Sequence, residues 1–237
     1  MTSKRTAAKP PPLAGICTFD DAQRPGLSVD ECVRRLKRYH YSLKRLHQVF
    51  NDRIPSEPVY ELKMAFSLHS HYCAEHVAAL RQRIGEMREP PLGLEAIPDE
   101  HLEIMFNEIL AATTTAELLL GVYEIALPSL RDALQHHLAE TNLLVDHPSV
   151  RVIRFALLEI GEMIAFGQAS IDALLDTEQR EAAADWLELL RHCLANAGAL
   201  EGAAKPTQHA TERQHSAKPY HFDGTPRRDE RFPDPYN

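Results

Sequence analysis

The stretch Phe155 to Phe166, FALLEIGEMIAF, decides the fold because it is apolar with a helical period and yet contains two glutamates one turn apart. Residues three and four apart share a helix face, so Glu159 and Glu162 fall on the side that carries Phe155 and Met163. An ionised carboxylate in an apolar core costs several kcal/mol unless it is paired, protonated or bound to a metal. The sequence therefore predicts a helical core that supplies a partner for these two acids.

The composition indicates a helical protein that binds neither nucleic acid nor membranes. The chain has 237 residues, is 44% hydrophobic, contains only 10 glycines and has a formal charge of −8, which gives no overall attraction to phosphate or anionic lipid. Its four cysteines have no metal-type spacing and its N-terminus has no apolar leader, so a reducing cytoplasm is expected. The longest apolar stretch, 118–130, is shorter than the roughly 20 residues of a membrane span.

The chain divides into a polar N-terminal arm (1–27), a helical bundle domain (28–200) and an extended or disordered C-terminal tail (201–237). A capping box at Ser28–Glu31, and prolines in the first turns after Ser56 and Asp146, mark helix starts. These signals and the hydrophobic period predict helices at 29–51, 57–88, 98–111, 114–142, 147–175 and 178–198, with a bend before Pro128. Two long helices, a long connection and two more long helices give the up-down-down-up order of a four-helix bundle with a crossover.

Further polar residues occupy positions that the helical period turns toward the core. In the first long helix, His40 and His47 belong to an apolar seam with steps of three and four residues. In the second, one face carries His69, Tyr72, Cys73 and His76. Glu124 lies inside the apolar run LLLGVYEIALPSL of the third. A bundle interior with mixed histidine and glutamate ligands is therefore predicted.

In these features the chain resembles the ferritin-like superfamily of carboxylate-bridged dimetal proteins. That family projects inward a carboxylate from each of two long helices and an acid-x-x-His motif from each of the other two. The resemblance is carried by the long crossover, by Glu124 and by Glu159-x-x-Glu162. It implies an all-α, ferritin-like up-down-down-up four-helix bundle with a long crossover and extra short helices. It also implies iron, in the family's di-iron arrangement, or manganese as the cofactor.

The chain departs from the family pattern at the ligand positions. His69-x-x-Tyr72 stands where an acid-x-x-His motif is usual, and the first helix presents histidines in place of a carboxylate. One metal ion, two ions or a site that has lost its metal all fit this ligand set. The expected function is a metal-dependent oxidoreductase or oxygenase, with Tyr72 as the catalytic hydrogen-bond or redox partner of the metal. The expected metal ligands are His69, His76, Glu124, Glu159 and Glu162.

Two other functions fit the same residues: a non-catalytic helical-bundle interaction protein with a degenerate metal site, and a metal storage protein. His40 and His47 are either ligands or hydrogen-bonded core residues. The glutamate pair alternatively neutralises a buried arginine, Arg35 or Arg38. In QHHLAE, the residues His136, His137 and Glu140 are either solvated at a helix C-terminus or join His147 in a three-histidine metal site.

The last 20 residues, KPYHFDGTPRRDERFPDPYN, mix aromatics, prolines and paired charges. This composition fits either a disordered end or an extended arm whose aromatic residues dock on the bundle, on a second subunit or on a protein partner. The two arms favour a homodimer, because a second copy offers apolar surface on which they can be buried.

Overall fold

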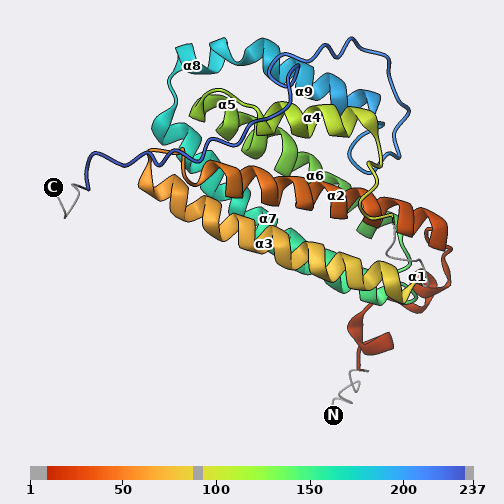
Figure 1. The fold of residues 1–237 in the computed structure, drawn as a ribbon. Coiled ribbons are helices and arrows are strands. Elements are labelled where there is room, and N and C mark those ends of the chain that lie inside the picture. The colour runs from red at the N-terminus through yellow and green to blue at the C-terminus, as the bar shows by residue number, and fades with distance from the viewer. Residues whose placement is uncertain (1–9, 88–92, 233–237) are drawn as a thin grey trace, which may run out of the picture.

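The computed structural model describes residues 10–87 and 93–232, and in these ranges every regular element is a helix (Figure 1). The predicted helix bounds agree with the observed ones to within a few residues, and the predicted end at residue 88 lies outside the described residues. Within the described ranges, no helix is both long and apolar enough to cross a bilayer. The elements are η1 (Pro12–Gly15), α1 (Phe19–Gln23), α2 (Val29–Arg53), α3 (Tyr60–Glu86), α4 (Glu100–Leu110), α5 (Thr115–Leu120), η2 (Gly121–Ala126), α6 (Leu127–Glu140), α7 (His147–Leu174), α8 (Thr177–Ala182) and α9 (Ala184–Asn196).

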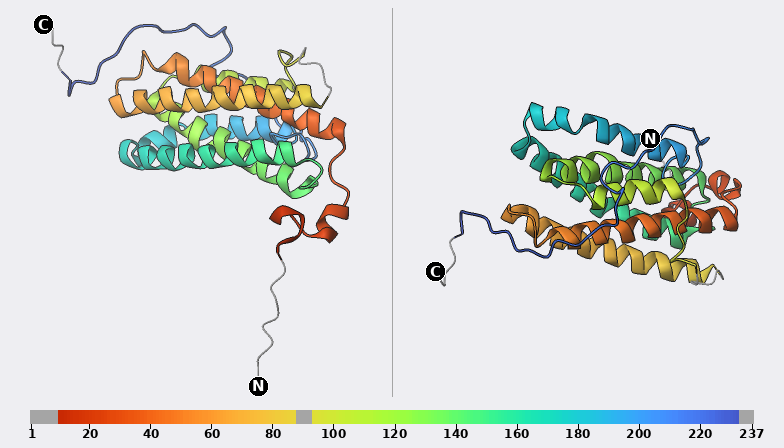
Figure 2. Two further views of the ribbon diagram at one scale, coloured as in Figure 1. Left: turned by 90° about the horizontal axis from the view of Figure 1, so that it is seen from below. Right: turned by 45° about the horizontal axis from the view of Figure 1, so that its top comes forward.

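The long helices pack in a closed order: α2 lies against α3, α3 against α7, α7 against α6, and α6 against α2. Figure 2 shows α3 and α7 side by side when the molecule is seen from below. The connection between α3 and α5 includes α4, which covers α2 from the opposite side and in turn packs against α9 (Figure 1). The all-α prediction is thus confirmed for the described residues, and α4 and α9 form an additional layer beside the long helices.

The seam predicted in α2 is the centre of the core. Ser28 Oγ accepts a hydrogen bond from the N–H of Glu31 at 3.2 Å, which starts the helix at the predicted residue. Of the predicted seam, Leu36, His40, Leu43 and Phe50 are buried, whereas His47 is half-buried. Tyr39 and Leu46, which were not part of the predicted seam, are fully buried beside it. Burial of each large apolar side chain contributes roughly 1.5–3 kcal/mol, so this helix anchors its neighbours.

The third long helix is continuous from α5 through η2 to α6, and η2 is a π-helical segment. Pro128 follows directly; it has no N–H and cannot donate to the carbonyl of Glu124. The N–H of Leu127 instead bonds to the carbonyl of Val122, five residues earlier. The predicted disturbance before Pro128 therefore takes the form of a π segment, as is common inside helices near polar sites.

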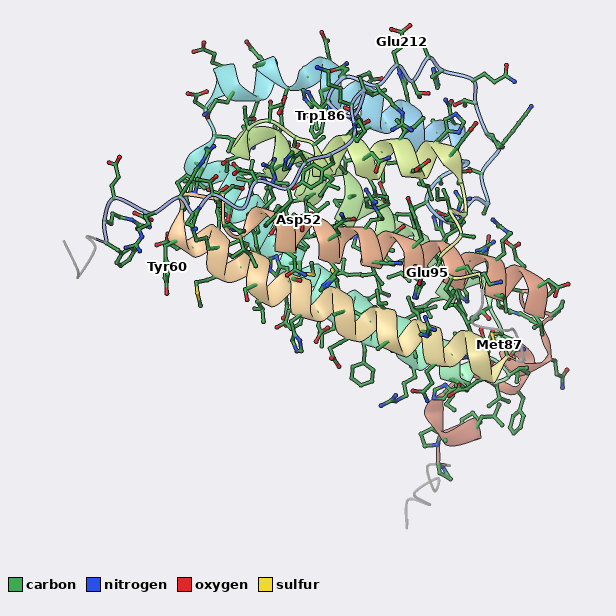
Figure 3. The ribbon with its side chains drawn as sticks, in the orientation of Figure 1. Asp52, Tyr60, Met87, Glu95, Trp186 and Glu212 are labelled. Atoms are coloured by element: carbon green, nitrogen blue, oxygen red, sulfur yellow. The ribbon has the colours of Figure 1, made fainter. Side chains whose placement is uncertain are left out.

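The described part of the tail, 201–232, lies against the bundle. Glu108 of α4 is fully buried, and its carboxylate accepts hydrogen bonds from Trp186 Nε1 and from the backbone N–H groups of Gln214, His215 and Ser216. Farther on, Phe232 packs on Tyr60 with ring centroids 5.0 Å apart. Figure 3 shows Tyr60 at the start of α3. Of the two alternatives for the tail, docking on the bundle is the one found in these residues.

Candidate functional site

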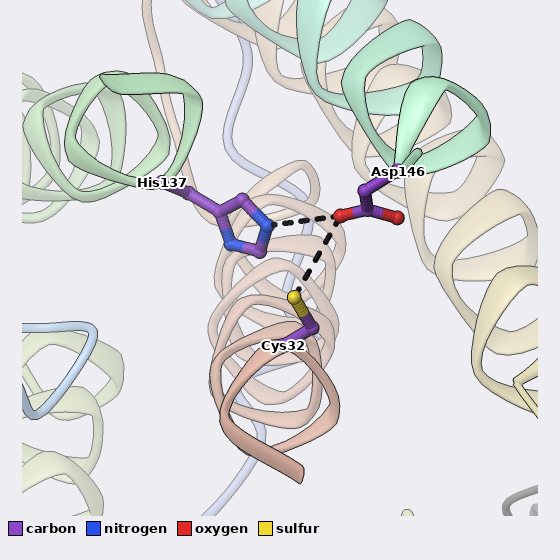
Figure 4. Close-up of side chains that lie close together, drawn as sticks. All are labelled: Cys32, His137 and Asp146. Atoms are coloured by element: carbon purple, nitrogen blue, oxygen red, sulfur yellow. Dashed lines mark hydrogen bonds and ion pairs between the residues drawn. The ribbon is translucent and has the colours of Figure 1, made fainter. Parts of the chain in front are cut away.

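Three side chains of metal-ligand type converge where the ends of three helices meet (Figure 4). Cys32 lies in the first turn of α2, His137 in the last turn of α6, and Asp146 directly precedes α7. Their sulfur, nitrogen and oxygen atoms all lie within 4.8 Å of one another, and all three residues are buried. The loop between α6 and α7 brings His137 and Asp146 together, and α2 supplies the third group.

Asp146 occupies the N-cap position of α7, but its side chain accepts no hydrogen bond from the first amides of that helix. The carboxylate points inward instead. Its Oδ2 accepts a hydrogen bond from Thr141 Oγ1 at 3.1 Å, and its Oδ1 accepts one from Arg83 at 2.9 Å. Arg83 thereby fixes the orientation of the carboxylate and leaves Oδ2 directed at Cys32 and His137.

His137 is the unusual member of this group. Its side chain has no exposed surface, and neither ring nitrogen makes a hydrogen bond. Nε2 lies 3.7 Å from Asp146 Oδ2, which is too long for a hydrogen bond. A buried polar atom without a partner costs about 1–3 kcal/mol, so this imidazole is placed where a ligand would satisfy it.

The spacing of the ligand atoms fits a metal ion. With the usual zinc bond lengths and tetrahedral angles, sulfur and oxygen ligands stand about 3.6 Å apart, and nitrogen and oxygen ligands about 3.4 Å apart. Here Cys32 Sγ is 3.7 Å from Asp146 Oδ2, and His137 Nε2 is also 3.7 Å from that oxygen. Small side-chain movements would place all three atoms around one ion.

The protonation states follow from the surroundings. Burial and the adjacent Asp146 carboxylate raise the pKa of the Cys32 thiol to about 11. Burial alone would raise the pKa of Asp146, but the nearby imidazole and the hydrogen-bond donors around the carboxylate outweigh it and lower the pKa to about 2. Near neutral pH the carboxylate is therefore ionised and the thiol is protonated. A metal ion would displace the thiol proton, as thiolate ligation requires.

A cavity of about 270 Å³ connects this group with the surface. Cys32 and Asp146 form its inner wall, together with Arg83. The rest of the wall consists of Leu27, Val29, Glu86, Met87 and Val145. An ion held by the three side chains would thus have one side facing this partly apolar space, which is slightly smaller than the roughly 300–1,000 Å³ of typical ligand pockets.

The predicted ligand His69 faces the interior, as expected, but its partner is not a carboxylate. Its Nδ1 lies 2.8 Å from the hydroxyl of Tyr123, and its ring packs against Phe50 and Phe166. Burial lowers the pKa of His69 to about 4, so the ring is neutral at physiological pH. His69 is therefore a hydrogen-bonded core residue.

The structure does bring together His76 and Glu159, whose Nε2 and Oε2 atoms are 2.6 Å apart. The pair lies beside a second surface cavity, of about 400 Å³, whose lining also includes Tyr72, Arg151 and Phe155. Tyr72 is half-buried there. The partner of Glu159 is thus His76. It is neither Arg35 nor Arg38, the arginines proposed from the sequence.

The remaining predicted ligands are far from this arrangement. Glu124 is half-buried and pairs with Arg180 at 3.0 Å, and Glu162 is exposed. The prediction that Glu162 faces the core is wrong, because the buried stripe of α7 runs through Ala156, Ile160, Met163 and Gly167, one position off the glutamates. In the described part of the chain, no three of the predicted ligands lie within ligand distance of one another.

The alternatives left open for the other histidines are resolved in most cases. His47 bonds through Nδ1 to the Ser70 carbonyl and through Nε2 to Asn51, which makes it a structural residue. His40 is buried. His136 pairs with Glu201 at 3.0 Å. Of the QHHLAE residues only His137 joins the cluster, with Cys32 and Asp146 in place of a histidine pair.

The predicted arginine partners of the glutamate pair are used elsewhere. Arg35 bonds to Glu31 at 2.7 Å and also pairs with Glu140. Arg38 donates to the backbone carbonyls of Ala197, Ala199 and Leu200. Both arginines therefore hold the first long helix against other segments and do not reach the acids of α7.

Sequence reasoning missed Cys32 and Asp146. Cys32 belongs to no spaced cysteine motif, and Asp146 was identified only as a helix start. A usable signal was present: Asp146 and His137 flank one short loop, and a histidine in the last turn of one helix lies near the first residue of the next. The approach of α2 to this loop is a tertiary contact that the local sequence does not encode.

Comparison with known proteins gave no relative. No family model matches the chain, and neither the curated proteins nor the solved structures contain a match.

Proposed function

We propose that this protein binds one divalent transition-metal ion through Cys32 Sγ, His137 Nε2 and Asp146 Oδ2. The observation that carries the proposal is the fully buried imidazole of His137, which has no hydrogen-bond partner and is directed at a thiol and a carboxylate at near-ligand spacing. Three protein ligands and a side open to a cavity are typical of catalytic metal sites, whereas structural zinc sites are closed by four ligands. The ion would act as a Lewis acid on a small molecule in the cavity.

The donor set favours zinc or iron over manganese, since thiolate and imidazole ligands suit the first two metals better. Zinc would support the activation of water, and iron would support the oxidoreductase or oxygenase chemistry expected from the sequence. A single three-ligand site holds one ion, which favours catalysis over storage. The four long helices fit a ferritin-like bundle, with the proposed ion near one end of the bundle. The free Cys32 thiol suits a reducing compartment such as the cytoplasm.

Elemental analysis of the purified protein, followed by titration of the metal-free protein with Co²⁺, tests the proposal. We expect about one ion per chain and a Co²⁺ spectrum with tetrahedral d–d bands and a thiolate charge-transfer band. Cys32→Ser should abolish the charge-transfer band. Cys193→Ser is the matched control, because Cys193 is an equally buried thiol in α9 that lies outside the cluster.

Two results would contradict the metal site. One is a folded wild-type protein that takes up neither Zn²⁺, Fe²⁺ nor Co²⁺ at micromolar concentration. The other is a charge-transfer band that survives Cys32→Ser and disappears in Cys193→Ser. If zinc is found, the iron-dependent reaction is excluded and water activation remains; if iron is found, the reverse holds.

A further inference from the structure

The exposed side of α7 carries an apolar stripe with a charge at each end. Phe155 and Leu158 are 54% and 63% exposed, and Arg154 and Glu162 lie on the same side of the helix. Neither Arg154 nor Glu162 forms an ion pair within residues 10–87 and 93–232. Such an apolar surface flanked by unpaired opposite charges is typical of an interaction site.

The stripe is self-complementary about Leu158. When a second α7 is laid antiparallel across the first, on a two-fold axis through Leu158, each residue before Leu158 stands level with one equally far after it. Arg154 is then level with Glu162 of the second copy, and Phe155 with Gly161 of the second copy. At the usual interaxial distance of about 8–10 Å, an arginine and a glutamate placed in this way reach each other. The symmetry forms both ion pairs at once.

Gly161 supports the same arrangement. A Cβ at this position would meet nothing within 4 Å, so the packing of the chain gives no reason for glycine there. Glycine in a helix interior costs about 0.8–1 kcal/mol relative to alanine. By contrast, a Cβ at Gly167 of the same helix would lie 2.1 Å from Tyr123 Cγ, so that glycine is required by the fold. The missing side chain at Gly161 leaves room for a bulky group of a second copy, such as its Phe155.

We infer that α7 is the contact between two copies of this chain, related by a two-fold axis at Leu158. The central contact is Leu158 on Leu158, flanked on each side by Phe155 over Gly161 and by an Arg154–Glu162 ion pair. No two like charges stand level in this arrangement, since Arg151 is level with Ala165. This inference is independent of the metal site, which lies at the end of α7 and not on this face.

Sedimentation equilibrium of the full chain tests the inference. We expect a species of twice 26.7 kDa at micromolar concentration. Arg154→Glu and Glu162→Arg each place like charges level twice per dimer and should weaken association by at least about tenfold. The double variant Arg154→Glu with Glu162→Arg recreates both pairs with reversed sign and should restore association to within about threefold of wild type.

Leu158→Glu should dissociate the dimer, whereas Ile97→Glu, at an equally exposed aliphatic residue before α4, should leave it intact. Circular dichroism checks that every variant is folded. A wild-type monomer at high micromolar concentration would overturn the inference. So would a dimer that persists in both single charge reversals, or a double variant that stays as weak as either single one.

Discussion

The middle of the α3/α7 layer and the junction of α2, α6 and α7 both bury histidines, but they satisfy them differently. In the layer, His69 bonds to the Tyr123 hydroxyl and His76 pairs with Glu159. At the junction, His137 has no hydrogen bond on either nitrogen. A buried polar group that is paired within the chain contributes to folding and has no unmet need for a ligand. In our proposal the metal ligand is His137, whose two ring nitrogens both lack a hydrogen-bond partner.

The two regions also differ in the origin of their groups. The pairs in the layer join side chains from the middles of long helices, where neighbouring turns fix their positions. The junction takes one residue from each of three helix ends, and its carboxylate is held by Arg83 from a fourth helix. Helix ends offer polar side chains at a place where a loop leaves space for a cavity, and this junction opens to one.

The largest effect is expected from substituting His137, the histidine that distinguishes the junction from the layer. His137→Phe removes the nitrogen ligand while filling its apolar surroundings beside Tyr39, and should weaken Zn²⁺ binding by at least about 100-fold. His76→Phe, in the layer, should leave the affinity within about twofold, because its partner lies outside the junction. Isothermal titration of metal-free protein with Zn²⁺, in competition with a chelator of known affinity, measures both. A loss of Zn²⁺ affinity in His76→Phe with none in His137→Phe would move the metal site to the layer.

The all-helical fold and most helix bounds were predictable because their signals are local. Ser28 caps α2, Pro148 lies in the first turn of α7, and Pro128 disturbs the turn before it, so each signal acts on residues close by in the sequence. The signal at Ser56 and Pro58 was less exact, since α3 begins at Tyr60 with Val59 as its N-cap residue. The phase of α7 was predicted one position off. In FALLEIGEMIAF the apolar residues on either side of each glutamate fit two neighbouring stripes of the helix. Close packing on Tyr123, which requires Gly167, is one tertiary contact that favours the observed stripe.

The candidate site was less predictable, for a different physical reason. His137 was recognised as a possible ligand, but its partners depend on how the start of α2 meets the loop after α6. The resemblance to dimetal proteins predicted ligands in the middles of the long helices, but two of the acids there have basic side chains as partners. Glu124 meets Arg180 of α8, and Glu159 meets His76. Such ion pairs form between elements distant in sequence, and no spacing rule indicates them.

The pH dependence of the free energy of unfolding should distinguish the structural histidine His69 from the proposed ligand His137. Burial lowers the pKa of His69 to about 4, below the value of about 6.5 expected in the unfolded chain. The unfolded state therefore binds the proton more tightly, and the contribution of a neutral His69 to stability is lost as the pH falls through this window. The slope approaches about 1.4 kcal/mol per pH unit once the unfolded-state histidine is fully protonated, so stability should drop by roughly 1.5 kcal/mol between pH 6.5 and pH 5 from this group alone.

Urea unfolding at both pH values, with a chelator present to remove any contribution from metal, measures this loss. His69→Gln has no titrating group at this position, so the drop in the free energy of unfolding should be smaller than in wild type by that amount. His221→Gln is a control, because His221 is exposed in the tail and bonds only to a neighbouring carbonyl. An identical pH dependence in wild type and His69→Gln would show that the ring is charged or accessible in the folded protein.

The smallest expected effect is a difference in the free energy of unfolding between substitutions of the two glutamates of FALLEIGEMIAF. Glu159→Gln keeps the shape of the side chain but removes the charge that faces buried His76, and should destabilise the fold by about 1 kcal/mol. Glu162→Gln changes an exposed group and should alter stability by less than about 0.5 kcal/mol. Both are best compared in the Leu158→Glu background, where association of two copies no longer contributes to the free energy of unfolding. Metal content should be unchanged in both variants, since neither acid belongs to the junction. A loss of metal in Glu159→Gln would restore the layer as a ligand site, and equal stability changes in the two variants would mean that the His76 pair contributes nothing to the fold.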